Sequence, residues 1–212
     1  MTDDLVFHGA MEQFMEAPEA CTRPGNAILN SLIRGWGNQG YSALEDYLMV
    51  CISHALTSEG PILECGSGLT TILAGAIAHI RGVGYWALEH KAKWARKVRT
   101  CLALYRMDTV VLCDPPLKDY GEFAWYDPPV SSMPGNFSLV ICDGPPGRTK
   151  GGRIGLVPVM KERLKHECVI LLDDADRKTE QKILKSWETE LGACAQHFGS
   201  TRSHAPLSVS PR

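Results

Sequence analysis

A short segment with two glycines is the first part of the sequence whose residue types and spacing could do chemistry. Glu64-Cys65-Gly66-Ser67-Gly68 follows an apolar run and opens a stretch with helical spacing. Glycine at such a turn lets a ligand approach the backbone closely, and the first turn of a helix offers N–H groups without partners inside the helix. The segment therefore predicts a ligand site between a strand and a helix, although two glycines alone do not identify the ligand.

Two acidic residues narrow the choice of ligand. Glu64 stands two residues before Gly66, where a carboxylate would repel a pyrophosphate and would favour a ligand with an amino group or a sulfonium. A dinucleotide-binding loop would need glycine at the position of Thr71. Glu89 ends the next apolar run, 21 residues after Gly68, and an acid there can accept hydrogen bonds from both ribose hydroxyls. The pattern favours a positively charged nucleoside, and NAD(P) remains the alternative.

Three further acidic residues follow the fourth and fifth apolar runs. Asp143 opens the turn Asp143-Gly144-Pro145-Pro146-Gly147, while Asp173 and Asp174 follow Leu172. Neighbouring parallel strands share one crevice at their carboxyl ends, so we expect Asp143 to lie near Asp173 or Asp174. These carboxylates could include a general base or the ligands of a divalent metal ion. For Asp174, a simple helix cap is the structural alternative.

The surrounding pattern predicts the elements that position these residues. Short apolar runs alternate with stretches of helical periodicity, which is typical of a parallel sheet covered by helices on both faces. Residues 114–136 contain five prolines and form the one long stretch without periodicity, which predicts a loop. The predicted strands are 62–63, 83–88, 109–113, 138–142 and 168–172, the predicted helices are 42–57, 69–80, 91–105 and 176–190, and 193–198 and 206–209 are predicted as a closing antiparallel hairpin.

Composition and charge are those of an ordinary globular protein. The chain has 212 residues, 44% of them hydrophobic, and its 22 basic and 24 acidic residues give a net charge of −2. A chain of this size can bury a core without disulfides or a structural metal, and its charge excludes a nucleic-acid binder held by net charge. We expect one domain over residues 1–212, with an N-terminal helical cap at 1–58 and an α/β core at 59–212.

The sequence also predicts a cytoplasmic protein without a membrane partner. The first residues are acidic, and the longest uncharged run has 16 residues, whereas a helix that spans a bilayer needs about 20 apolar residues. The eight cysteines are never closer than 12 residues, which excludes a Cys-x-x-Cys zinc or redox motif. Half of them fall in apolar runs, where a reduced cysteine acts as a small hydrophobic side chain.

The order of these motifs resembles that of class I S-adenosylmethionine (SAM) dependent methyltransferases, in a small branch related to the O-methyltransferases. The resemblance covers about residues 60–190 and rests on acids or glycines after each of the first four strands: Glu64-x-Gly66-x-Gly68, Glu89, Asp114 and Asp143. It implies a Rossmann-like, doubly wound sheet of seven strands with a C-terminal antiparallel hairpin. It also implies that SAM lies across the carboxyl ends of the strands. One departure is Thr70, which stands where many members have a third glycine.

The same resemblance assigns roles to the motif residues. The residues that would bind SAM are Glu64, Gly66, Ser67 and Gly68 for the methionine part, Glu89 for the ribose, His90 and Asp114 beside the adenine, and Asp143 near the methyl group. Asp143 and Asp174 would be the catalytic residues.

A metal is the open question of this resemblance. In the catechol-type branch, an acid after the fourth strand and an Asp-Asn pair after the fifth bind magnesium. Here Asp174 stands in place of the asparagine, and Pro146 stands where that branch often carries a lysine base. Without that lysine, Asp143 is the expected base, and a base bound to a metal would be a poorer one. We therefore expect transfer without a metal and keep Mg²⁺ as a less favoured cofactor.

Together these inferences predict an enzyme that transfers a methyl group from SAM to an oxygen or nitrogen of a small molecule. Only the first 60 residues and the 114–136 loop are left to shape a pocket, which favours a small acceptor over a nucleic acid or another macromolecule. The alternatives are an NAD(P)-dependent oxidoreductase and a SAM-binding module without activity. The apolar N-terminal helix could also pair two chains as a homodimer.

Overall fold

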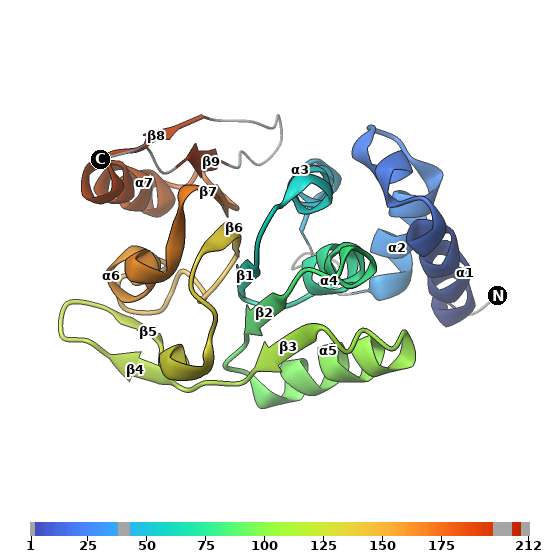
Figure 1. The fold of residues 1–212 in the computed structure, drawn as a ribbon, viewed down its shortest axis with the longest axis horizontal. Coiled ribbons are helices and arrows are strands. Elements are labelled where there is room, and N and C mark those ends of the chain that lie inside the picture. Colours follow the sequence, from blue (N-terminus) through green and yellow to red (C-terminus); the bar gives the residue numbers. More distant parts are fainter. Residues whose placement is uncertain (1–2, 38–42, 197–204, 209–212) are drawn as a thin grey trace.

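A sheet of seven strands forms the centre of the protein (Figure 1). The structure, a computed structural model, describes residues 3–37, 43–196 and 205–208. The strands of this sheet are β1 (Ile62–Cys65), β2 (Tyr85–Leu88), β3 (Val110–Cys113), β6 (Phe137–Cys142), β7 (Leu164–Leu172), β8 (Cys194–Ala195) and β9 (Ala205–Ser208). They lie in the order β3-β2-β1-β6-β7-β9-β8.

The pairing of the strands confirms the predicted doubly wound sheet. β1 pairs in parallel with β2 and β6, β2 with β3, and β6 with β7. β9 runs antiparallel to both β7 and β8 and so closes the sheet with the expected antiparallel strands. The register places Cys65 beside both Leu88 and Cys142. The carboxyl ends of β1, β2 and β6 are therefore level with one another.

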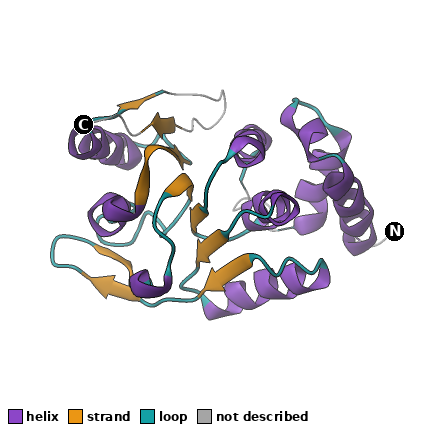
Figure 2. Ribbon diagram, viewed as in Figure 1, coloured by secondary structure: helices purple, strands orange, loops and turns teal. Residues whose placement is uncertain are grey.

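Helices cover both faces of the sheet (Figure 2). The α-helices are α1 (Asp3–Glu16), α2 (Ala27–Trp36), α3 (Glu45–Thr57), α4 (Leu69–Arg81), α5 (Ala92–Leu104), α6 (Leu156–Met160) and α7 (Lys178–Leu191), and the 3-10 helices are η1 (Pro18–Thr22), η2 (Val130–Ser132) and η3 (Lys161–Arg163). One core joins α1 to α5 with Ile62 of β1, and a second joins α6 and α7 with Leu63. Because successive strand residues face opposite sides, Glu64 lies on the α4 side and Cys65 on the α7 side.

The helices before β1 pack into the same core as α4. Phe14 of α1 and Leu29 of α2 are fully buried in it. The helix predicted at 42–57 is α3, which begins at Glu45. The predicted division of the chain at residue 58 stays a prediction.

The segment predicted as a long loop contains a β-hairpin. β4 (Leu117–Asp119) and β5 (Ala124–Tyr126) pair antiparallel, and Trp125 and Tyr126 are buried in the second core. The prediction of an irregular loop was wrong for these residues, because strands of three residues are too short to show a period of two. The predicted turn at Gly199-Ser200 lies outside the described residues.

The structure also describes the length of the helices and the state of the cysteines. Within the described residues, no helix is both long and apolar enough to cross a membrane. All eight cysteines are free thiols, and Cys65, Cys142 and Cys168 are buried as small core residues.

Candidate active site

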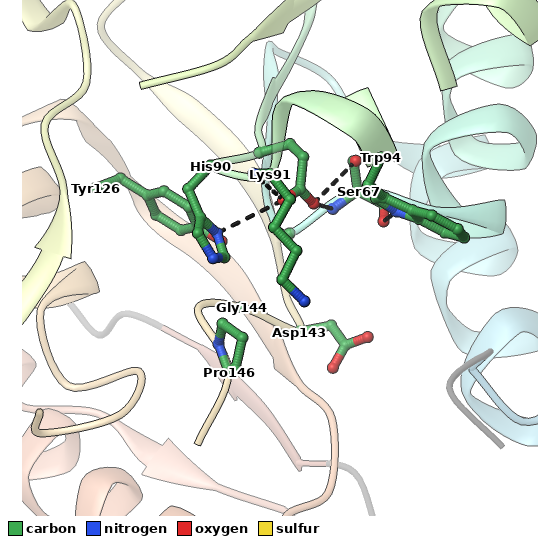
Figure 3. A pocket seen from close by; sticks show the side chains of 10 residues that line it. Ser67, His90, Lys91, Trp94, Tyr126, Asp143, Gly144 and Pro146 are labelled. Carbon is green, nitrogen blue, oxygen red and sulfur yellow. Dashed lines mark hydrogen bonds and ion pairs between the residues drawn. The ribbon is translucent and has the colours of Figure 1, made fainter. Parts of the chain in front are cut away.

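A cavity of about 360 Å³ lies where β1, β2 and β6 end (Figure 3). Its walls come from the glycine loop after β1, the residues after β2, the hairpin and the turn after β6. Ligand pockets typically measure about 300–1,000 Å³, so the cavity can hold a molecule of nucleoside size. Five of the predicted site residues line it: Gly66, Ser67, Glu89, His90 and Asp143.

Gly66 brings two turns of the backbone into contact. Its φ of 93° lies in the left-handed region that favours glycine. A Cβ at this position would come within 3.2 Å of the Gly144 nitrogen and 3.3 Å of the Asp143 carbonyl carbon. Gly68 is different, because its φ of 175° is ordinary extended backbone and a side chain there would enter open space. The protein's own packing therefore requires glycine at position 66 but not at position 68.

Glu89 ties the glycine loop to the end of β2. Its Oε2 accepts hydrogen bonds from the backbone nitrogen of Ser67 at 3.3 Å and from the Ser67 hydroxyl at 3.2 Å, and its Oε1 accepts one from the backbone nitrogen of Lys91 at 2.8 Å. The side chain is buried but borders the cavity. Since a carboxylate has about four lone-pair positions, Glu89 can still accept a hydrogen bond from a ligand.

Trp94 is a site residue that sequence reasoning missed, because the apolar periodicity predicts it only as part of a buried stripe. Its indole Nε1 donates to the Ser67 carbonyl at 2.6 Å, and the ring lines the cavity. Trp36 packs edge-on against it with ring centroids 6.0 Å apart. Nζ of Lys97 lies 4.1 Å from the Trp36 ring centroid and 4.9 Å from that of Trp94. α2 and α5 thus support the glycine loop from outside.

Two residues from opposite sides complete the cavity. The Lys91 side chain extends toward the turn that carries Asp143 and Pro146 (Figure 3). Tyr126 of the hairpin lies beside His90, with ring centroids 5.9 Å apart. Burial raises the pKa of the Tyr126 hydroxyl well above its usual value and lowers the pKa of His90. Both shifts favour the neutral form of the side chain.

Glu64 points away from this cavity, toward the first turn of α4. Its carboxylate accepts hydrogen bonds from the hydroxyls of Thr70, Thr71 and Tyr85, the last two at 2.6 and 2.9 Å. Burial raises the pKa of Glu64 to about 8, although these hydrogen bonds act in the opposite direction. The residue borders a small recess that Trp36 also lines.

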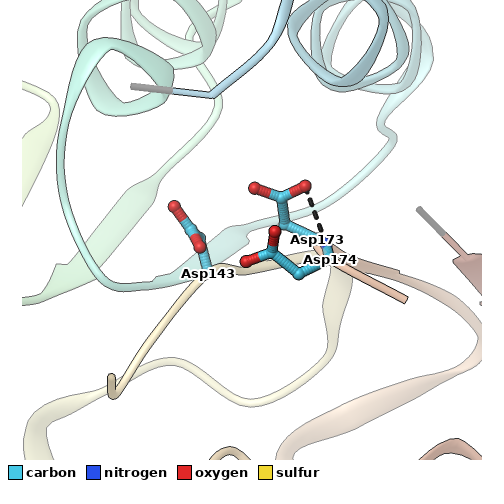
Figure 4. Close-up of side chains that lie close together, drawn as sticks. All are labelled: Asp143, Asp173 and Asp174. Atoms are coloured by element: carbon cyan, nitrogen blue, oxygen red, sulfur yellow. Dashed lines mark hydrogen bonds between the residues drawn. The ribbon is translucent and has the colours of Figure 1, made fainter. Parts of the chain in front are cut away.

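Asp143, Asp173 and Asp174 come together at the ends of β6 and β7 (Figure 4). One oxygen from each carboxylate lies within 4.8 Å of the others. The Asp143 side chain is 36% exposed and lines the cavity, whereas Asp173 and Asp174 are buried. This spacing is compatible with a metal ion, but the cluster also contains a cation of the chain itself.

That cation is Arg153, which follows the Asp143 turn in the sequence and to which the sequence alone gives no role. Its Nη2 donates to Asp143 Oδ1 at 2.8 Å and lies 3.4 Å from Asp174 Oδ2, and its Nη1 donates to the Asp173 carbonyl at 2.6 Å. Only 2% of the residue is exposed. Burial by itself lowers the pKa of the guanidinium. The surrounding negative charges, Asp143 above all, outweigh this effect, so the pKa of Arg153 is raised overall.

Asp174 is engaged with a second arginine as well. Its Oδ2 pairs with Nη1 of Arg177 at 2.8 Å, and its backbone nitrogen donates to Asp173 Oδ1 at 2.8 Å. Asp174 Oδ1 is buried and has no hydrogen-bond partner within the described part of the chain. Burial, followed by the charges of Asp143 and Asp174, raises the pKa of Asp173 to about 7. The catalytic role predicted for Asp174 thus falls on a buried carboxylate held by two arginines.

Asp114 is an exposed residue directly after β3. Its side chain is 52% exposed and lies 3.6 Å from Nη2 of Arg99. It is not among the residues that line the 360 Å³ cavity. Its contact with adenine stays a prediction.

Solved structures provide the comparison with known proteins, since no family model and no curated protein matches the sequence. The SAH-bound methyltransferase PaMTH1 of Podospora anserina has a TM-score of 0.65 at 14% identity, covering 95% of this chain and 88% of that chain. A putative caffeoyl-CoA O-methyltransferase of Staphylococcus aureus has a TM-score of 0.60 at 11% identity, covering 80% and 85%. An O-methyltransferase of Bacillus cereus in complex with SAH has a TM-score of 0.57 at 12% identity, covering 95% and 91%.

These neighbours match most of this chain at TM-scores of 0.57–0.65. At identities of 11–14% the likeness concerns the fold. The chain therefore has the fold of the class I SAM-dependent methyltransferases, as the motif order predicted.

Proposed function

We propose that the protein is a SAM-dependent methyltransferase that acts on an oxygen or nitrogen atom of a small molecule. The observation that carries this proposal is the cavity at the ends of β1, β2 and β6, which joins a glycine loop, a buried acid after β2 and a partly exposed aspartate after β6. In an open α/β sheet, ligands bind outside the carboxyl ends of the strands. Fold likeness raises the expectation of this activity, and the residues of the cavity supply its chemistry.

The residues present fit a SAM molecule. Gly66 lines the cavity and has no side chain, so a ligand can approach the backbone of the loop there. Glu89 keeps a lone pair that can accept a hydrogen bond from a ribose hydroxyl. We assign the methionine part to the loop Gly66-Ser67-Gly68 and the adenine to the wall formed by His90 and Tyr126. Glu64 would position the loop indirectly, because its carboxylate holds the hydroxyls of Thr70 and Thr71 in the first turn of α4.

SAM supplies a methyl group on a positively charged sulfur, and the protein has to position the acceptor and remove its proton. Holding two reactants in line is worth up to about 7–11 kcal/mol of the barrier. We propose that the carboxylate of Asp143 takes this proton as the general base. It lines the cavity and is partly exposed, so it can release the proton to solvent. Asp174 does not line this cavity, and we assign it a supporting role through its contact with Arg153.

The remaining features of the proposal follow from size and composition. The cavity is small, about 360 Å³, which supports a small-molecule acceptor over a nucleic acid. We also propose a cytoplasmic location, supported by eight free cysteines. A homodimer through the N-terminal helices stays a prediction.

The experiment that tests the donor is a calorimetric titration with SAM, SAH and NADH. We expect SAM and SAH to bind and NADH not to bind. Gly66→Val should abolish SAM binding, because valine at a φ of 93° is strained and its side chain would push against the turn after β6. Gly84→Ala is the matched control, since a Cβ there meets nothing within 4 Å. Binding of NADH in place of SAM, or unchanged SAM affinity in Gly66→Val, would contradict the proposal.

A second experiment addresses the acceptor. Wild-type protein and Asp143→Asn are incubated with SAM and with phenols, sugars, amines and carboxylates in turn, and SAH formation is measured. Turnover that depends on one class and on Asp143 would identify the acceptor atom. SAM binding without turnover on any class would favour a binding module instead.

A further inference from the structure

The acid cluster of Asp143, Asp173 and Asp174 is stabilised by a positive charge, which Arg153 supplies. Three carboxylates whose oxygens lie within 4.8 Å of one another repel each other when they are ionised. The guanidinium of Arg153 lies among them, 2.8 Å from Asp143 Oδ1 and 3.4 Å from Asp174 Oδ2. Since Arg153 is buried, its charge is directed at these carboxylates rather than at solvent.

The cluster with Arg153 in place does not fit a resident divalent ion. Mg²⁺ binds carboxylate oxygens at about 2.0–2.1 Å, and Nη2 of Arg153 already contacts one oxygen each of Asp143 and Asp174. Oδ1 of Asp174, which has no hydrogen-bond partner among the described residues, offers one ligand, but an ion held there would lie close to the guanidinium. The two cations would also repel each other in a buried site. Arg153 is anchored from a second direction, because its guanidinium donates to the carbonyls of Asp143 at 3.1 Å and Asp173 at 2.6 Å.

The loop before Arg153 is built to deliver this side chain. Gly151 and Gly152 have φ values of 75° and 58°, in the region that favours glycine, and the Gly152 nitrogen donates to the Thr149 carbonyl at 2.7 Å. This tight turn leads the chain back under the hairpin, where the Ala124 nitrogen donates to the Lys150 carbonyl at 2.9 Å. Arg153 follows this turn and reaches Asp143 and Asp173 at the ends of β6 and β7.

We propose that Arg153 takes the place of a divalent metal in this cluster and is the positioning residue that fixes Asp143 at the wall of the cavity. The proposal rests on the function proposed above and adds the reason why the reaction needs no metal. Arginine suits the task better than lysine, because its planar group donates to several acceptors in fixed directions.

The direct test measures metal binding by the whole protein. Wild-type protein stripped with EDTA is titrated with Mn²⁺, and free Mn²⁺ is followed by electron paramagnetic resonance. We expect no site with a Kd below about 1 mM, which corresponds to negligible specific affinity. Methyl transfer should proceed in EDTA at the rate seen with Mg²⁺. One Mn²⁺ bound per chain at micromolar concentration and lost in Asp143→Asn would overturn the proposal, as would activity that EDTA abolishes and Mg²⁺ restores.

A pair of matched variants separates Arg153 from general charge effects. Arg153→Gln removes the guanidinium from all three acids, whereas Arg177→Gln removes only the half-exposed partner of Asp174. We expect Arg153→Gln to bind Mn²⁺ at least about 10-fold more tightly than wild type and to lose about 10-fold or more in kcat, the effect of losing hydrogen bonds to a charged group. Its Kd for SAM should stay within about 3-fold, since Arg153 does not line the cavity. Arg177→Gln should keep the metal affinity and kcat of wild type within about 3-fold.

An equal gain of Mn²⁺ binding in both variants would contradict a specific role of Arg153. If Arg153→Gln does not fold, the wild-type titration still decides whether the cluster binds a metal. Failure of wild-type protein to bind SAM would defeat the proposed function, and the Mn²⁺ titration is independent of that result. The two failures are therefore distinguishable.

Discussion

The single buried acid Glu64 and the cluster of Asp143, Asp173 and Asp174 lie at the same edge of the sheet, and the protein stabilises these two acid groups by different means. Glu64 is surrounded by hydroxyl groups from α4 and β2, which are neutral donors. In the other group, the guanidinium of Arg153 contacts the carboxylates of Asp143 and Asp174 and donates to the backbone carbonyl of Asp173. Hydroxyl groups can orient a carboxylate but carry no compensating charge. An arginine orients the carboxylate and also supplies a positive charge.

This difference indicates a structural role for Glu64 and a catalytic role for Asp143. Burial raises the pKa of Glu64 to about 8, so this group can take up a proton as the protein folds. Asp143 combines an arginine contact with a side chain that is 36% exposed to the cavity. The Asp143 carboxylate is fixed in position and accessible, so it can take a proton from a methyl acceptor. The Glu64 carboxylate is enclosed by hydroxyl groups, so it can stabilise the start of α4.

The largest expected effect is on the pH dependence of stability through Glu64. Its pKa of about 8 in the folded protein lies above the unfolded value of 4.5, so its contribution is fully present below pH 4.5 and is lost as the pH rises through 8. Glu64→Gln stays neutral and should be more stable than wild type at pH 8 by on the order of 3 kcal/mol, with little difference near pH 5. Urea unfolding at pH 5, 6.5 and 8 measures this. The exposed Glu59→Gln is the control, and parallel pH curves for wild type and Glu64→Gln would contradict the difference between the two acid groups.

The next effect is on turnover through Asp143. Asp143→Asn cannot take up the acceptor's proton, so kcat should fall by about 10²-fold or more while SAM affinity stays nearly unchanged. Steady-state kinetics and calorimetry on the same preparations measure the two quantities. Asp176→Asn, an exposed residue of the turn after β7, should keep wild-type kinetics. Full turnover in Asp143→Asn would show that the accessible acid is not the base.

A smaller effect is expected at Glu89, a buried acid that belongs to neither group. Glu89→Ala removes a charged acceptor from the cavity and frees Ser67, so SAM affinity should fall by about 10- to 100-fold, equivalent to about 1.5–3 kcal/mol. Calorimetric titration with SAM measures the change. Wild-type affinity in this variant would mean that the ribose does not lie at the end of β2.

The smallest effect tests the support of the glycine loop. Trp94→Phe keeps an aromatic ring against Trp36 but removes the donor to the Ser67 carbonyl. The loss of one neutral hydrogen bond, about 0.5–1.5 kcal/mol, should weaken SAM binding by about 3- to 10-fold without changing kcat. A drop in kcat with unchanged SAM affinity would place Trp94 at the acceptor instead.

Sequence reasoning succeeded where the signal is local. The strands at 62–63 and 138–142 and the helix at 69–80 were predicted close to their observed bounds, because period, glycine position and apolar runs are properties of consecutive residues. It failed at the hairpin of Trp125 and Tyr126, where prolines and three-residue strands leave no period. It also gave no role to Arg153, although this arginine follows the Asp143 turn in the sequence, because the sequence does not show which acids its side chain reaches.

The order of the elements and the acids at the strand ends are what the sequence determined by itself. Parallel topology then requires Glu89 and Asp143 to meet at one edge, whatever the details of packing. The environment of each acid was decided only by the tertiary structure. Glu64 faces the hydroxyls of α4 because of its side of the strand, and Asp143 meets Arg153 because a glycine turn folds back under the hairpin. Burial and charge compensation arise between segments distant in the chain, and therefore no local pattern contains them.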